Sequence, residues 1–285
     1  MLNYRITYKK LKNAFLIPSV FWIVTFFLIP VFLMLIYAFF ERGDYGGVKY
    51  NFTLINFTLI FDDLYYKIIL KTFVVAILNS LLCLLAGYPI AYFISTQKNQ
   101  SIKNTLLVLV ILPFLTNFLI RTYAWMVLLG NEGLINTILF NLKIIDNPLQ
   151  LLFTPFAVQL GLFYNYLPFI ILPLYSSIEK INKNLYLASN DLGGSNLKTF
   201  LNVTLPLSKS GIFTGLFLVF IPTLGEFIIP DILGGSKSVM IGNIVKDQFL
   251  TARNWPFGSA LVFIIMFALL IVMSAKNIIT KYNAK

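Results

Sequence analysis

The sequence predicts an all-α polytopic membrane protein with six transmembrane helices and both termini in the cytoplasm. Of its 285 residues, 58% are apolar and only 12% are charged, whereas a soluble domain is about half apolar and about a quarter charged. The apolar residues form long runs, and most of the charged residues lie between the runs. This distribution is typical of a chain that crosses a membrane several times.

Six runs reach the roughly 20 mostly apolar residues that a transmembrane helix needs. We expect spans at about 14–40, 72–95, 105–129, 152–175, 211–232 and 257–275. They form one transmembrane domain, 14–275, between tails at 1–13 and 276–285. The first run follows basic residues, as in a signal peptide, but it is too long for such a peptide and ends without a small-residue cleavage site. We therefore expect it to remain as a membrane helix.

The charges on the loops give the orientation. The two termini and the loops 96–104 and 176–210 carry thirteen basic residues and two acidic ones. The loops 41–71, 130–151 and 233–256 carry eight basic and seven acidic residues. Because loops rich in Lys and Arg stay in the cytoplasm, the first set is predicted to be cytoplasmic. Topology thus accounts for the net charge of +11 without nucleic-acid binding.

Residue types that common catalytic sites need are missing. The chain has no histidine and a single cysteine, Cys83, so the sequence predicts no histidine-based triad, thiolate metal cluster or intrachain disulfide. The segment LGGSKS at 233–238 lacks the glycine before lysine and the upstream glycine of a phosphate-binding loop. We therefore expect neither a cofactor nor a metal in this chain, and any ATP hydrolysis belongs to another subunit.

The cytoplasmic loop 176–210 predicts a helical hairpin. Asn184 is a candidate N-cap for a first short helix, Gly193 and Gly194 end that helix, Ser195 can cap a second helix, and Pro206 closes the unit. Apolar stripes run along both helices, at Leu185, Ala188 and Leu192 and at Leu197, Phe200 and Leu201. These stripes either pack on the chain's own membrane domain or dock in a groove of another protein.

The spacing in this loop resembles the EAA loop of bacterial ATP-binding-cassette (ABC) importer permeases. That pattern reads E-A-A, three residues, Gly, nine residues, Ile, one residue, Leu-Pro. The matching positions here are Leu187, Ala188, Ser189, Gly193, Val203, Leu205 and Pro206, with Asp191 inside the same segment. Leu187 replaces the glutamate and Ser189 replaces the second alanine. The resemblance implies that this loop couples the chain to an ATPase, with one charged contact fewer than usual.

The resemblance covers most of residues 105–275. The segments VILPFLTNFLIRTYAW at 110–125 and LGEFIIPDILGGSKSVMIGNIVKDQFLTARNWPFGSA at 224–260 are similar to permeases of spermidine/putrescine importers, closest to their B-type subunit. That family implies a six-helix permease of the MetI-like fold in the bacterial inner membrane. It also implies a second permease, a pair of ATPase subunits that use ATP and Mg, and an extracytoplasmic polyamine-binding protein as partners.

A polyamine needs carboxylates for its ammonium groups and aromatic faces for its methylene stem. Glu226 is the acid placed well inside a predicted span, and Asp231 lies at the outer end of that span. At about 1.5 Å per residue, Glu226 lies about 9 Å and Arg121 about 12 Å from the outer ends of their spans, so the two can form an ion pair. Tyr123, Trp125, Tyr164 and Tyr166 lie in the same outer half. These aromatic residues either line the solute path or belong to packing and interfacial positions.

The sequence therefore predicts a non-catalytic permease subunit of an ATP-driven polyamine importer. The nearest alternative is the same machine with another small solute, such as an amino acid, a sugar or an oxyanion. A stand-alone secondary carrier or channel would not need the docking hairpin. A membrane-bound enzyme is disfavoured by the missing histidine and by the lack of a carboxylate cluster.

Overall fold

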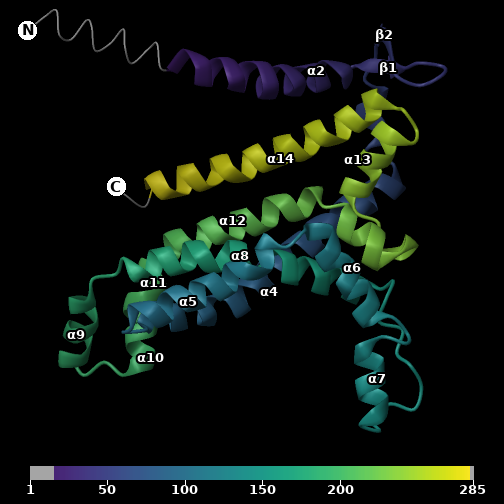
Figure 1. Cartoon of the computed structure of the whole chain (residues 1–285). Helices are drawn as coiled ribbons and strands as arrows, with labels where there is room; N and C mark the ends of the chain where they lie inside the picture. The colour runs from purple at the N-terminus through teal and green to yellow at the C-terminus, as the bar shows by residue number, and fades with distance from the viewer. Residues whose placement is uncertain (1–15, 283–285) are drawn as a thin grey trace, which may run out of the picture. The chain divides into compact units, whose positions relative to one another are not determined.

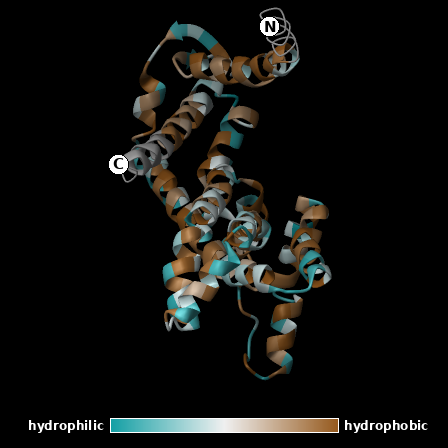
Figure 2. Ribbon diagram, turned by 90° about the vertical axis from the view of Figure 1, so that its left-hand side faces the viewer, coloured by the Kyte–Doolittle hydropathy of each residue, from teal (hydrophilic) through white to brown (hydrophobic). Residues whose placement is uncertain are grey.

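The computed structural model describes residues 16–282, so the predicted tail 1–13 and the last three residues lie outside the described part. The chain divides into two compact units, residues 67–243 and a second unit made of residues up to 66 together with 244 onward. Most helices of both units carry hydrophobic residues on several sides (Figure 2). This is the surface expected of helices whose solvent is lipid.

The helices follow the predicted spans in order (Figure 1). Their bounds are Leu16–Tyr37 (ending as α2, Ile29–Tyr37), α3 Ile55–Leu59, α4 Asp63–Thr96, α5 Gln100–Ile111, α6 Phe118–Leu129, α7 Leu134–Asn141, α8 Pro155–Glu179, α9 Lys183–Asp191, α10 Asn196–Thr199, α11 Leu205–Leu207, α12 Lys209–Gly225, α13 Ile241–Leu250 and α14 Trp255–Tyr282. Short 3-10 turns lie at Leu112–Leu115 and Ser236–Ser238, and π-helical turns lie at Val24–Leu28, Phe200–Thr204 and Pro230–Gly234.

Two predicted spans differ from single straight helices. Within residues 16–282, three helices are long and apolar enough to cross a membrane, and the number rises to five if each of two bent pairs counts as one span. The third predicted span, 105–129, is broken after Leu115, where the chain bends by 87°. The fifth, 211–232, is interrupted at Glu226, where the backbone is extended between the end of α12 and the helical segment that includes Pro230–Gly234. Hydropathy averages over such breaks, because the few polar residues at each break are outweighed by the apolar residues around them.

The unit 67–243 is built around α8. Its Ile170 lies between two glycines, Gly87 of α4 and Gly215 of α12, and a Cβ added to either glycine would come within 2.6 Å of the Ile170 side chain. Glycine therefore lets three helices approach closely, as is common between membrane helices. A buried hydrogen-bond chain also joins them, since Gln159 donates to Asn79 at 3.2 Å and Asn79 donates to Thr223 at 3.1 Å.

The other unit contains a feature that an all-α prediction misses. Strands β1 (Phe40–Arg42) and β2 (Val48–Phe52) form an antiparallel two-stranded sheet. The backbone amide of Gly47 donates to the Arg253 carbonyl at 2.7 Å, and the Arg42 guanidinium donates to the Ala252 carbonyl at 2.8 Å. The hairpin is thereby attached to the turn before α14. That helix continues to Tyr282, through most of the predicted tail 276–285.

Candidate functional site

The loop at 176–210 folds as the predicted helical hairpin. Helix α9 begins two residues earlier than expected, because Asn182 rather than Asn184 is its N-cap and accepts a hydrogen bond from the Asn184 amide at 3.0 Å. Gly193 has φ of +74°, in the left-handed region that glycine adopts without strain. Ser195 caps α10 by accepting from the Lys198 amide at 3.4 Å. The glycine bend and the second cap are confirmed, and the first cap was placed wrongly.

A contact between hydroxyl groups joins the two arms of the hairpin. Ser189 Oγ of α9 lies 2.7 Å from Thr199 Oγ1 of α10. A Cβ at Gly194 would come within 2.6 Å of Ser189 Oγ, so the bend fits tightly beneath this pair. Ser189 stands where the EAA pattern has alanine, and alanine could not make this bond. The substitution therefore adds a link between the arms.

The outer faces of the hairpin expose apolar side chains. Leu187, which stands at the glutamate place of the pattern, is 60% exposed, and Leu192 at the bend is 89% exposed. Ala188 and Val203 line the hollow between the arms, and Asp191 is exposed at the end of α9. Such a surface is suited to burial in a groove of a partner.

The second arm is also attached to the membrane helices. Phe200, predicted to share one stripe with Leu197 and Leu201, instead packs edge-on against Tyr88 and Tyr92 of α4, with ring centroids 5.5 and 5.7 Å away. Leu205 and Pro206 form the short α11 that leads into α12, and the two helical segments meet at a bend of 63°. A force on the hairpin would thus act directly on α4 and α12.

Glu226 lies beyond the end of α12 rather than inside a helix. Its Oε1 accepts hydrogen bonds from the amides of Phe227, Ile228 and Ile229 at 3.1, 2.9 and 3.3 Å. Its Oε2 accepts from the Tyr166 hydroxyl at 2.6 Å, and the residue is only 8% exposed. The carboxylate therefore caps the next helical segment and holds α8 against it, as a buried acid in an apolar segment requires.

Arg121 has a corresponding role at the break in the third span. Its Nη1 donates to the Pro113 carbonyl at 2.8 Å, and its guanidinium lies 5.3 Å from the centre of the Phe114 ring. Among the described residues, no ion pair joins Arg121 to Glu226, so the pairing that the sequence allows is not formed in this structure. A cation at the carbonyl end of a helical segment is favoured by its dipole.

The other candidates for the solute path are divided between two places. Trp125 and Tyr164 pack edge-on, with ring centroids 5.5 Å apart, and Tyr123 is exposed on α6. Tyr166 instead is buried with Glu226. Asp231 is exposed and accepts a hydrogen bond from Asn243 at 2.5 Å.

Two polar features of the fold have no counterpart in the sequence predictions. Lys103 of α5 is 5% exposed and donates to both carboxylate oxygens of Glu179 of α8, at 2.8 and 2.9 Å. Asn117 caps α6 by accepting from the amides of Leu119 and Ile120 at 2.8 and 3.4 Å. The pair Pro113 and Asn117 inside an apolar run is the signal that could have revealed this second feature.

Comparisons with known proteins find relatives over nearly the whole chain. Residues 84–282 match the family described as binding-protein-dependent transport system inner membrane component. The chain is 40% identical over 276 residues to the spermidine/putrescine transport system permease protein PotB of Salmonella typhimurium (strain LT2), covering 95% of this chain and 96% of the relative. It is 40% identical over 270 residues to PotB of Escherichia coli (strain K12), covering 93% and 98%. For PotB of Haemophilus influenzae, identity is 42% over 239 residues, covering 84% and 83%.

Solved structures share the fold. A bacterial ABC transporter that imports the acidic polysaccharide alginate superposes with a TM-score of 0.76 at 18% identity, covering 97% of both chains. A bacterial alginate ABC transporter in complex with a periplasmic protein bound to an alginate pentasaccharide gives 0.75 at 18% identity, covering 95% of this chain and 94% of that one. The predicted importer-permease fold is thus confirmed. By sequence and by fold, the chain belongs to the family of binding-protein-dependent transport system inner membrane components.

Proposed function

We propose that this chain is a transmembrane permease subunit of an ABC importer that brings polyamines, spermidine or putrescine, into the cell. The observation that carries the proposal is the 40% identity to PotB permeases over nearly the whole chain. The chain itself is not an enzyme. It has six spans in the bacterial inner membrane and both termini in the cytoplasm, in keeping with the distribution of basic residues on its loops.

The proposed partners are the other subunits of an ABC importer. A second permease completes the membrane passage, a pair of ATPase subunits binds ATP and Mg, and an extracytoplasmic binding protein delivers the polyamine. The exposed leucines of the hairpin, Leu187 and Leu192, enter a groove of the ATPase. Closure of the ATPase pair moves the hairpin, and the contacts of Phe200 with α4 carry that motion to the spans.

In this proposal the solute path is lined by those acidic and aromatic candidates that are not buried in the structure. Asp231 is exposed and supplies a carboxylate for an ammonium group. Tyr123, Tyr164 and Trp125 supply ring faces for the methylene stem and for cation–π contact. Glu226 and Tyr166 do not bind the solute in this proposal, because their polar atoms already bind each other and the backbone. They stabilise the helices that carry the path.

Purification of the assembled complex tests this proposal. We expect the chain to copurify with an ATPase and a second permease, and the ATPase rate to rise when binding protein loaded with spermidine is added. Binding protein without polyamine, or with an amino acid or a sugar, is the control. Equal stimulation by an amino acid would move the proposal to another solute, and purification without any ATPase would reject the ABC class.

A further inference from the structure

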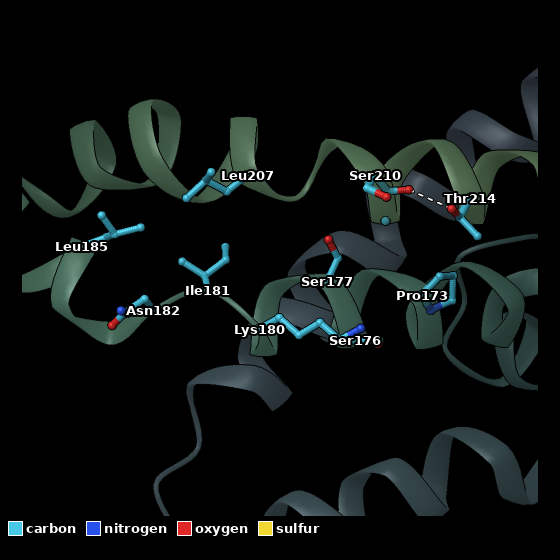
Figure 3. Close-up of a pocket in the computed structure, with 11 residues that line it drawn as sticks. Pro173, Ser176, Ser177, Lys180, Ile181, Asn182, Leu185, Leu207, Ser210 and Thr214 are labelled. Carbon is cyan, nitrogen blue, oxygen red and sulfur yellow. Dashed lines mark hydrogen bonds between the residues drawn. The ribbon is translucent and has the colours of Figure 1, made fainter. Parts of the chain in front are cut away.

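An open surface cavity with a mixed polar and apolar lining lies beside the helical hairpin at 176–210 and takes no part in the mechanism described so far. It has a volume of about 560 Å³ and is bounded by the C-terminal end of α8, the start of α12 and the start of α9 (Figure 3). Its polar lining consists of Ser176, Ser177, Lys180, Asn182, Ser210 and Thr214, and Ile181 and Leu207 are among its apolar residues. A ligand here would touch the spans and the hairpin together.

The charge of the cavity favours an anion. Lys180 is the charged residue in the lining, and no lining residue is acidic. The neighbouring acid, Glu179, is bound by Lys103 through two hydrogen bonds of 2.8 and 2.9 Å, so its charge is already compensated. A transported polycation would meet an ammonium group here and find no carboxylate.

The hydroxyl groups supply donors for such an anion. Within the described chain, the hydroxyls of Ser176, Ser177 and Ser210 make no hydrogen bond. Gly211 lets α8 and α12 approach, since a Cβ there would come within 2.6 Å of Ser177 Cβ. Ser177 of α8 consequently faces the segment of α12 that carries Ser210 (Figure 3). A tetrahedral anion can accept from several hydroxyls and an ammonium group at once.

We propose that this cavity binds a phosphate group, with Lys180 as its counter-charge and Ser177 and Ser210 as hydrogen-bond donors. The phosphate belongs either to the headgroup of an anionic lipid in the inner leaflet or to a soluble phosphate ester in the cytoplasm. The apolar wall, which includes Ile181 and Leu207, suits the first methylene groups of a lipid's acyl chains, whereas a soluble ester would use the polar residues of the lining alone. Because Asn182 caps α9, a bound phosphate would hold the hairpin against the spans. The proposal rests on the cytoplasmic placement of this loop in the proposed function.

Binding is measured by thermal unfolding of the whole complex purified in detergent. The probes are short-chain phosphatidylglycerol, short-chain phosphatidylcholine and glycerol 3-phosphate, each titrated without ATP. We expect phosphatidylglycerol to raise the unfolding temperature in a saturable way. In Lys180→Gln the apparent dissociation constant should rise roughly tenfold, the size of one lost charge-assisted hydrogen bond. Lys183→Gln, on the neighbouring helix and outside the lining, is the matched control and should behave as the wild type.

The three probes show whether the bound phosphate comes from a lipid headgroup or from a soluble ester. Stabilisation by phosphatidylglycerol alone assigns the site to lipid, and equal stabilisation by glycerol 3-phosphate assigns it to a soluble ester. No saturable stabilisation, equal loss in Lys180→Gln and Lys183→Gln, or stabilisation by spermidine that depends on Lys180 would each overturn the proposal. Ser177→Ala, which keeps the charge and removes one donor, should weaken binding severalfold. Spermidine uptake is measured separately, so failure of the proposed cargo is distinguishable from failure of this site.

Discussion

Glu226 gives the sharpest test of the structure against the sequence. The sequence allows it either a place in the solute path or an ion pair with Arg121, whereas the structure gives it a capping role. In Glu226→Ala, three backbone amides and the Tyr166 hydroxyl lose their acceptor. Loss of an N-cap costs about 0.5–2 kcal/mol, and leaving a buried polar group unsatisfied costs about 1–3 kcal/mol. The expected loss of stability is therefore roughly 1.5–5 kcal/mol.

The conservative variant should behave differently. In Glu226→Gln, one amide oxygen can still accept from the backbone, and the amide nitrogen can donate to the Tyr166 oxygen. We expect a loss of only about 1 kcal/mol, from the charge-assisted part of the bonds. Tyr166→Phe leaves the second carboxylate oxygen without its donor and should cost about 1.5–3 kcal/mol.

The assay is thermal unfolding of the purified complex, combined with the KM for spermidine in the same preparation. Tyr45→Phe, which alters a fully exposed tyrosine outside the proposed path, is the control and should change stability by less than about 0.5 kcal/mol. A capping role predicts that the Glu226 variants lose stability in the order stated, while KM stays close to the wild-type value. A severalfold rise in KM for Glu226→Gln at unchanged stability would refute this reasoning and return Glu226 to the solute path.

Three other predictions concern the hairpin and its surroundings. Gly193→Pro forces φ from +74° to about −65°, so we expect normal membrane insertion but no stimulation of the ATPase by loaded binding protein; full stimulation would contradict a coupling role. Glu179→Gln leaves the buried ammonium of Lys103 without a carboxylate. Because Glu179 is itself partly exposed, we expect the free energy of unfolding to fall by only about 1–3 kcal/mol. An unchanged thermal unfolding temperature would contradict a stabilising ion pair. Ser189→Ala and Thr199→Val remove the same hydrogen bond, so the double variant should lose about 1 kcal/mol less than the sum of the single ones, whereas additive losses would show that the hydroxyls do not interact.

The helical hairpin at 176–210 was predictable because its signals are local. Gly193, Ser195 and Pro206 each restrict the backbone in a known way, and their spacing is fixed along the chain. The first cap was misplaced because Asn182 and Asn184 are chemically identical, and only the direction of the chain after α8 decides between them.

The roles of Glu226 and Tyr166 were less predictable, because they depend on a contact between residues that are far apart in the sequence. Glu226 and Tyr166 are 60 residues apart, and nothing in either segment indicates that they share a hydrogen bond. The breaks at Asn117 and Glu226 lie in strongly apolar runs, so a hydropathy average treats each run as one helix. The β-hairpin was missed for a similar reason, since its strands are held by the turn near Arg253, far away in the chain.

The most direct test of the whole account is uptake of radiolabelled spermidine by sealed vesicles that contain this chain, its second permease and the ATPase pair. We predict uptake that requires ATP inside the compartment corresponding to the cytoplasm and the binding protein on the opposite side, with putrescine as a competitor. It should be lost in Gly193→Pro although the complex remains assembled. Spermidine uptake that proceeds without ATP or without the binding protein, or persists unchanged in Gly193→Pro, would contradict the account.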